Sequence, residues 1–137
     1  MLRISFRNIV LFIFLKYLIF AIILATLDNR FKSMVTDVSH TAAEWIAGTF
    51  HYSMYVLLVT ILFVVLFCGP YWLVFQIKNT IVFFLAALLI LALDACCYVW
   101  LNAAGIWRYG ETHFLVGILT MLICFFKPIR QKILFHF

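Results

Sequence analysis

The chain has 137 residues, of which 68% are hydrophobic, 19% aromatic and 11% charged, with a net charge of +5. Soluble domains carry about 25% charged residues, so this composition excludes a soluble domain and predicts an integral membrane protein. At about 20 residues per span, the length fits a single all-α bundle over residues 1–137 with four transmembrane helices and no appended soluble domain. The positive charge is explained by membrane orientation, and no nucleic-acid partner is expected.

The first predicted span covers residues 8–27 and follows Arg3 and Arg7. It is too long for a signal peptide, and no small-x-small cleavage site follows it, so we interpret it as a retained helix. Lys16 interrupts its apolar sequence, and the polar residues 28–30 end it.

An amphipathic segment over residues 33–50 follows in the first loop. Its apolar side chains recur at spacings of three and four, at Met34, Val38, Ala42, Trp45 and Thr49. Such a pattern predicts an interfacial helix lying on the extracytoplasmic membrane surface.

The second predicted span covers residues 53–75 and contains Gly69 and Pro70 near its cytoplasmic end. Proline removes a helical hydrogen bond, so these residues predict a kink, either a simple packing feature or the moving part of a carrier. The short connection over residues 76–80 makes the second and third spans antiparallel neighbours.

The third predicted span, residues 81–102, contains a single carboxylate, Asp94. Nothing in the hydrocarbon can solvate a carboxylate. Such a group must therefore be neutralised, be paired with another group, or serve the function of the protein. Asp94 lies about 21 Å from the cytoplasmic end of its span and Lys16 about 14 Å deep, a gap that an extended lysine can bridge. Lys16 can equally extend towards the cytoplasm, leaving Asp94 protonated and donating to Tyr17 or a carbonyl. For Asp94 we favour a polar contact that holds helices of the bundle together or binds a partner helix. A proton site is the second interpretation, and contact with a substrate is the third.

The fourth predicted span, residues 111–127, contains an apolar stretch of only 13 residues from Phe114 to Phe126, so a re-entrant segment is the alternative. With the N-terminus inside, seven of the ten basic residues fall on the cytoplasmic side, namely Arg3, Arg7, Lys16, Lys78, Lys127, Arg130 and Lys132. This bias predicts an N-in, C-in topology. Interfacial aromatic belts are then expected, outside at Trp45, Tyr52, Trp100, Trp107 and Tyr109 and inside at Tyr71 and Trp72.

A weak extracytoplasmic metal candidate comes from the two outer loops, with His40, Glu44, His51, Glu111 and His113. The i, i+4 spacing of His40 and Glu44 allows two side chains to share one ion, although a solvated helix face explains the same residues. We therefore predict no cofactor.

Enzymatic function has no support in the sequence. The chain shows no Ser-His-Asp arrangement, no HExxH motif and no glycine-rich phosphate loop. The four cysteines all fall in apolar stretches, where they behave as small hydrophobic residues.

Three families of small membrane proteins provide comparisons. Small multidrug-resistance exporters use a glutamate in the first span, where this chain has Lys16, and the glycine-rich, arginine-containing stretch of fluoride channels has no counterpart. The chain is similar to immunity proteins against pore-forming bacteriocins in size, helix number and topology, and in no motif.

The sequence therefore predicts a non-enzymatic protein of the inner membrane of a bacterium. It would act by helix–helix binding to another membrane component, as an accessory subunit, assembly factor or immunity-type inhibitor. The alternative is a small homo-oligomeric transporter or proton-coupled carrier that uses Asp94.

Overall fold

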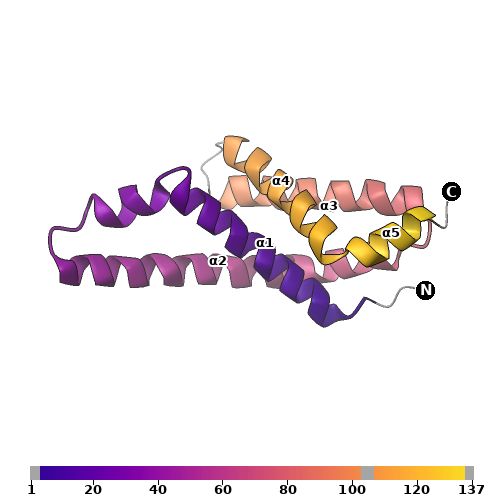
Figure 1. Ribbon diagram of the computed structural model, residues 1–137, viewed down its shortest axis with the longest axis horizontal. Helices are drawn as coiled ribbons and strands as arrows, with labels where there is room; N and C mark the ends of the chain where they lie inside the picture. The colour runs from indigo at the N-terminus through magenta and orange to yellow at the C-terminus, as the bar shows by residue number, and fades with distance from the viewer. Residues whose placement is uncertain (1–3, 103–106, 135–137) are drawn as a thin grey trace.

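The computed structural model describes residues 4–102 and 107–134, and every regular element within these ranges is helical. This confirms the all-α class. The elements are α1 (Phe6–Thr26), η1 (Lys32–Thr36), α2 (Ala42–Gln76), α3 (Thr80–Asn102), α4 (Trp107–Cys124) and α5 (Phe126–Leu134). Both α1 and α3 pack against α2 and α4, so these four helices surround a common core (Figure 1).

Three of the described helices, α1, α2 and α3, are long and apolar enough to cross a membrane. The chain is accordingly an integral membrane protein. The predicted spans 8–27 and 81–102 match α1 and α3 closely. Helix α4 corresponds to the predicted span 111–127 but is less apolar, because Arg108, Glu111 and His113 lie in its first two turns.

Helix α2 differs most from the sequence-based prediction. Residues 33–50 do not form a separate surface helix, because η1 ends at Thr36 and α2 begins at Ala42 and continues without a break to Gln76. At 1.5 Å per residue its 35 residues extend about 52 Å, against about 30 Å of hydrocarbon. About 20 Å of this helix therefore lies beyond the length needed for a span.

A capping arrangement explains why α2 begins where it does. The Thr41 hydroxyl accepts a hydrogen bond from the Glu44 backbone N–H at 3.2 Å, and the Glu44 carboxylate accepts one from the His40 N–H at 2.7 Å. This arrangement resembles a capping box, which satisfies free N–H groups of a first helical turn. The sequence after it contains no proline before Pro70, so the helix continues into the span.

Residues 31–55 form a helical arm, in which η1 folds back on the first half of α2 and projects past the end of α3 (Figure 1). The Phe31 ring contacts Trp45 and Tyr52, with centroid distances of 6.1 and 5.5 Å. Val35 is buried against Gly48, where an added Cβ would lie 3.2 Å from the valine. The glycine therefore permits the close approach of the two parts of the arm.

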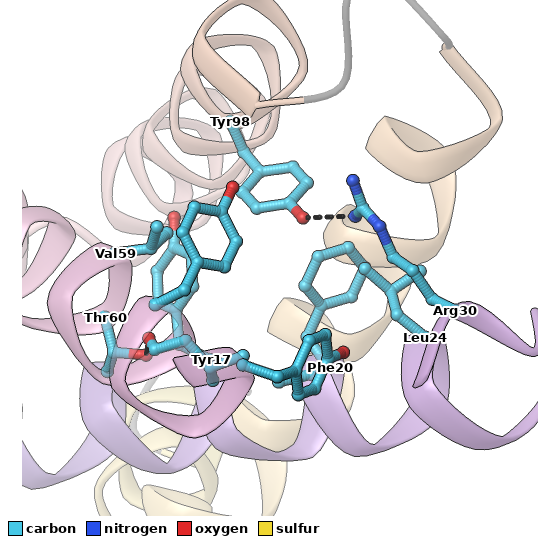
Figure 2. Close-up of a pocket in the computed structure, with 11 residues that line it drawn as sticks. Tyr17, Phe20, Leu24, Arg30, Val59, Thr60 and Tyr98 are labelled. Atoms are coloured by element: carbon cyan, nitrogen blue, oxygen red, sulfur yellow. Dashed lines mark hydrogen bonds between the residues drawn. The ribbon is translucent and has the colours of Figure 1, made fainter. Parts of the chain in front are cut away.

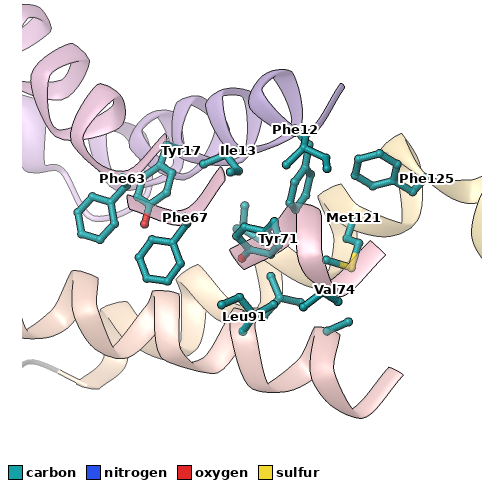
Figure 3. Packing of buried hydrophobic residues seen from close by; sticks show 14 of the residues in the cluster. Phe12, Ile13, Tyr17, Phe63, Phe67, Tyr71, Val74, Leu91, Met121 and Phe125 are labelled. Carbon is teal, nitrogen blue, oxygen red and sulfur yellow. The ribbon is translucent and has the colours of Figure 1, made fainter. Parts of the chain in front are cut away.

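The core contains buried residues at spacings of three and four along each long helix (Figure 3). On α1 they are Ile9, Phe12, Ile13, Lys16, Tyr17, Phe20 and Leu24, and on α2 they are Thr60, Phe63, Phe67, Tyr71, Val74 and Phe75. One face of each helix is thus directed inward, and the opposite faces are exposed and apolar.

Helix α2 is helical throughout Gly69 and Pro70. Pro70 is exposed, and a Cβ added at Gly69 would have no neighbour within 4 Å. Both residues therefore lie away from the packed core, and the kink proposed for them stays a prediction.

Helices α3 and α4 approach closely at two glycines of α4 that are seven residues apart. A Cβ at Gly110 would lie 2.7 Å from Val99, and one at Gly117 would lie 2.7 Å from Leu91. Small residues on one helix face allow such backbone approach between membrane helices. The packing of α4 therefore depends on these two positions.

Candidate functional site

Asp94 and Lys16 form an ion pair at the centre of the bundle, between the middle of α1 and the C-terminal half of α3. Both side chains are completely buried. Of the alternatives left open by the sequence, the structure shows the pair between Lys16 and Asp94. Their positions, about 15 and 21 Å from the starts of their helices, are close enough for the lysine to span the difference.

Two tyrosines complete the hydrogen bonding of the carboxylate. The Tyr17 hydroxyl donates to Oδ1 of Asp94, and the Tyr71 hydroxyl donates to Oδ2 at 3.0 Å. The Lys16 ammonium also donates to the Tyr71 oxygen at 3.2 Å. We call these four residues the polar clasp; they join α1, α2 and α3.

Tyr71 is the member of the clasp that sequence reasoning misplaces. The sequence predicts it in the inner aromatic belt, yet its side chain is fully buried in the bundle. Side chains on a helix lean towards its N-terminus, and α2 and α3 are antiparallel. Tyr71 and Asp94 therefore lean towards each other. The four-residue spacing from Phe63 through Phe67 to Tyr71 is a signal for this inward position.

Aromatic rings surround the clasp. Phe63 stacks on Tyr17 at a centroid distance of 4.9 Å, and Phe12 makes an edge contact with Tyr71 at 5.4 Å. Phe67 contacts Tyr71 at 6.3 Å and stacks on Phe63 at 6.1 Å (Figure 3). In surroundings of such low polarity an unpaired charge is costly, and a fully bonded network is favourable.

Gly117 of helix α4 lies next to the Lys16 side chain. A Cβ there would lie 3.4 Å from Cδ of Lys16, so the absence of a side chain leaves room for the lysine stem. The ammonium group is thereby guided between α1 and α3 towards Asp94.

His113 lies inside the bundle rather than in the outer loop, which corrects its proposed place in a metal site. Its ring is 1% exposed, stacks on Tyr98 at 5.3 Å and contacts Tyr17 and Phe20 at 4.9 and 4.8 Å. Neither ring nitrogen has a hydrogen-bond partner among the described residues. The metal hypothesis places His113 at the loop end of the predicted span 111–127, whereas α4 begins at Trp107 and His113 lies in its second turn.

The other metal candidates do not come together either. Glu44 caps α2, and the His51 ring contacts the Ala47 carbonyl of its own helix at 2.7 Å. Within residues 4–102 and 107–134, no three His, Cys, Asp or Glu side chains are arranged to hold a metal ion. His40 is exposed in the connection between η1 and α2, and Glu111 is exposed on α4.

The polar clasp is neutral as a whole and closed to solvent, and these two properties determine what it can do chemically. Asp94 and Lys16 neutralise each other, both carboxylate oxygens have donors, and no part of either side chain reaches the surface. This geometry is suited to holding three helices in register, as buried polar contacts do in membrane bundles. A nucleophile or general base would need access to a substrate that this geometry does not provide.

Comparison of the chain with protein-family models, with curated proteins and with solved structures returns no match in any of the three.

Proposed function

We propose that this protein is a non-enzymatic membrane bundle that acts by helix–helix binding to another membrane component, as an accessory subunit, assembly factor or immunity-type inhibitor. The observation that carries the proposal is the complete burial and mutual satisfaction of the Lys16–Asp94 pair. The two charges buried in the described bundle thus bind each other. The apolar exterior and the helical arm are left as the surfaces that can contact other molecules.

The proposed setting is the inner membrane of a bacterium, with four spans and both termini in the cytoplasm. Lys78 precedes α3 and Lys127 lies in the first turn of the short α5, so both bases would lie on the cytoplasmic side. In this orientation α4 is the fourth span and the arm projects outside.

The exterior includes a groove suited to a partner helix. It has a volume of about 390 Å³, lies between α3 and α4, and is lined mainly by small or apolar residues, Ala92, Ala95, Cys96, Trp107, Gly110 and Phe114, with Glu111 among them. Small residues allow a second helix to approach closely, which is how membrane helices associate where the hydrophobic effect supplies no net force. Glu111 would lie near the polar end of such a partner.

Site-specific photocrosslinking tests this proposal. A benzoylphenylalanine in place of Ala92, in the groove, should crosslink to one membrane protein in its native membrane. The same group at Leu85, which is 64% exposed on α3 outside the groove, serves as the matched control. An Ala92→Trp substitution that fills the groove should abolish complex formation with the same partner. Equal crosslinking to many proteins at both positions would contradict the proposal.

A proton-coupled carrier is the second candidate, and the position of His113 is the observation that favours it. This titratable side chain contacts the Tyr17 ring, and the Tyr17 hydroxyl bonds to Asp94, so three ionisable groups lie in sequence inside the bundle. Proton flux into liposomes that is lost in a folded Asp94→Asn variant would support the carrier. Absence of flux from the wild-type protein would count against it.

A further inference from the structure

A small cavity lies beside the clasp, between α1, α2 and α3 (Figure 2). Its volume is about 30 Å³, which is enough for one or two atoms or molecules the size of water. Tyr17, Phe20, Tyr52 and Tyr98 are among the residues that line it. Arg30 closes one side, with its guanidinium directed at the Tyr98 hydroxyl in Figure 2.

Arg30 has no acidic partner in the described part of the chain. The ion pairs there are Lys16–Asp94 and Arg108–Asp28, and the nearest acid in sequence, Asp28, is thus held by Arg108 at 2.7 Å. Arg30 is half-buried, donates one hydrogen bond to Tyr98 at 3.4 Å and lies over the Tyr109 ring at 5.5 Å. A guanidinium carries five N–H donors, so most of its donor capacity is directed at no acceptor that the structure shows.

Tyr98 adds a second donor at the same place. Its oxygen accepts the bond from Arg30, which leaves its own O–H hydrogen for another acceptor. The cavity wall is otherwise largely apolar, and the half-buried guanidinium has no counter-ion among the described residues. The Arg30 guanidinium and the Tyr98 hydroxyl therefore both line a cavity that has room for one or two small ligands.

We propose that this cavity, the Arg30–Tyr98 site, binds a small monatomic anion of the halide class, with chloride as the physiological ligand. Chloride is only slightly larger than water and accepts hydrogen bonds from guanidinium and phenol groups in any direction. A phosphate group or a lipid headgroup needs more room than about 30 Å³ provides. The site is separate from the clasp and the groove, and the inference does not depend on the proposed function.

Chloride-35 NMR line broadening on the purified full-length protein in detergent tests this site. The probe is sodium chloride, with sodium gluconate added to keep the ionic strength constant. We expect saturable broadening that bromide displaces. Arg30→Gln should weaken binding about ten- to a hundredfold, the value of a charged hydrogen bond.

The matched control is Lys32→Gln, because this exposed base lies two residues from Arg30, does not line the cavity and leaves the Arg108–Asp28 pair intact, so the broadening should be unchanged. Tyr98→Phe keeps the ring and removes only the hydroxyl, so it tests the site even if Arg30→Gln does not fold. We expect Tyr98→Phe to weaken binding severalfold. The proposal is overturned by absence of saturable broadening in the wild type, by equal loss in Lys32→Gln, or by displacement by inorganic phosphate at lower concentration than by bromide.

Discussion

Removing one charge of the polar clasp should destabilise the bundle far more than removing both. In Asp94→Asn the Lys16 ammonium stays at zero exposure with no counter-charge. The expected loss is about 3–5 kcal/mol of unfolding free energy, or roughly two to four orders of magnitude in the folding equilibrium. Lys16→Met leaves the carboxylate with only the two tyrosine donors and should cost a similar amount.

The double variant Lys16→Met with Asp94→Asn contains no buried charge in the clasp, and the side-chain oxygen of the introduced asparagine still accepts from the tyrosines. It should cost much less than either single variant, which gives a coupling energy of about 3 kcal/mol or more. The assay is equilibrium unfolding in mixed micelles with increasing sodium dodecyl sulfate, followed by circular dichroism. Lys78→Met, at an exposed lysine, is the control and should change stability by less than about 0.5 kcal/mol. Single variants within about 1 kcal/mol of the wild type, or costs that simply add in the double variant, would refute this reasoning.

Three further outcomes are expected. Gly117→Ala should lose about 1–3 kcal/mol in the same unfolding assay through overpacking, whereas Gly69→Ala, in open space, should gain about 0.5–1 kcal/mol; equal effects would show that α4 does not need its close approach. His113→Phe should gain about 1–3 kcal/mol, because two buried ring nitrogens without partners are removed, and a loss in that assay would mean that the imidazole has an acceptor or donor in the membrane. In a variant without native cysteines, Asp37→Cys should react with an impermeant maleimide on intact cells and Lys78→Cys only after permeabilisation, and the reverse labelling would disprove the proposed topology.

Most of the helical architecture could be predicted from the sequence, because apolar stretches of about 20 residues have few alternatives in a membrane. The bounds of α1 and α3 follow from the polar residues at their ends. The start of α2 is not predicted, although the Thr41 and Glu44 capping signal stands in the sequence. The amphipathic pattern of residues 33–50 predicts contact with the membrane surface, whereas much of it reflects packing within the arm.

The candidate site could be predicted only in part. Composition identifies Asp94 and Lys16 as exceptional, and helix geometry shows that they can meet. Sequence could not decide between pairing and protonation, since this depends on how the helices are rotated about their axes. Tyr71 and His113 are misplaced for the same reason, because their positions near predicted helix ends suggest an interface. The spacing from Phe63 to Tyr71 indicates the inward position of Tyr71, whereas only the packing of neighbouring rings shows that His113 is buried.

The proposed function rests on binding to another membrane component, and native mass spectrometry tests this most directly. The protein would be extracted from its own membrane in mild detergent and its intact assemblies weighed. The account predicts a complex of fixed stoichiometry with a second membrane protein, which is lost in the Ala92→Trp variant while the bundle stays folded. A wild-type protein that appears only as a monomer or a homo-oligomer would contradict it.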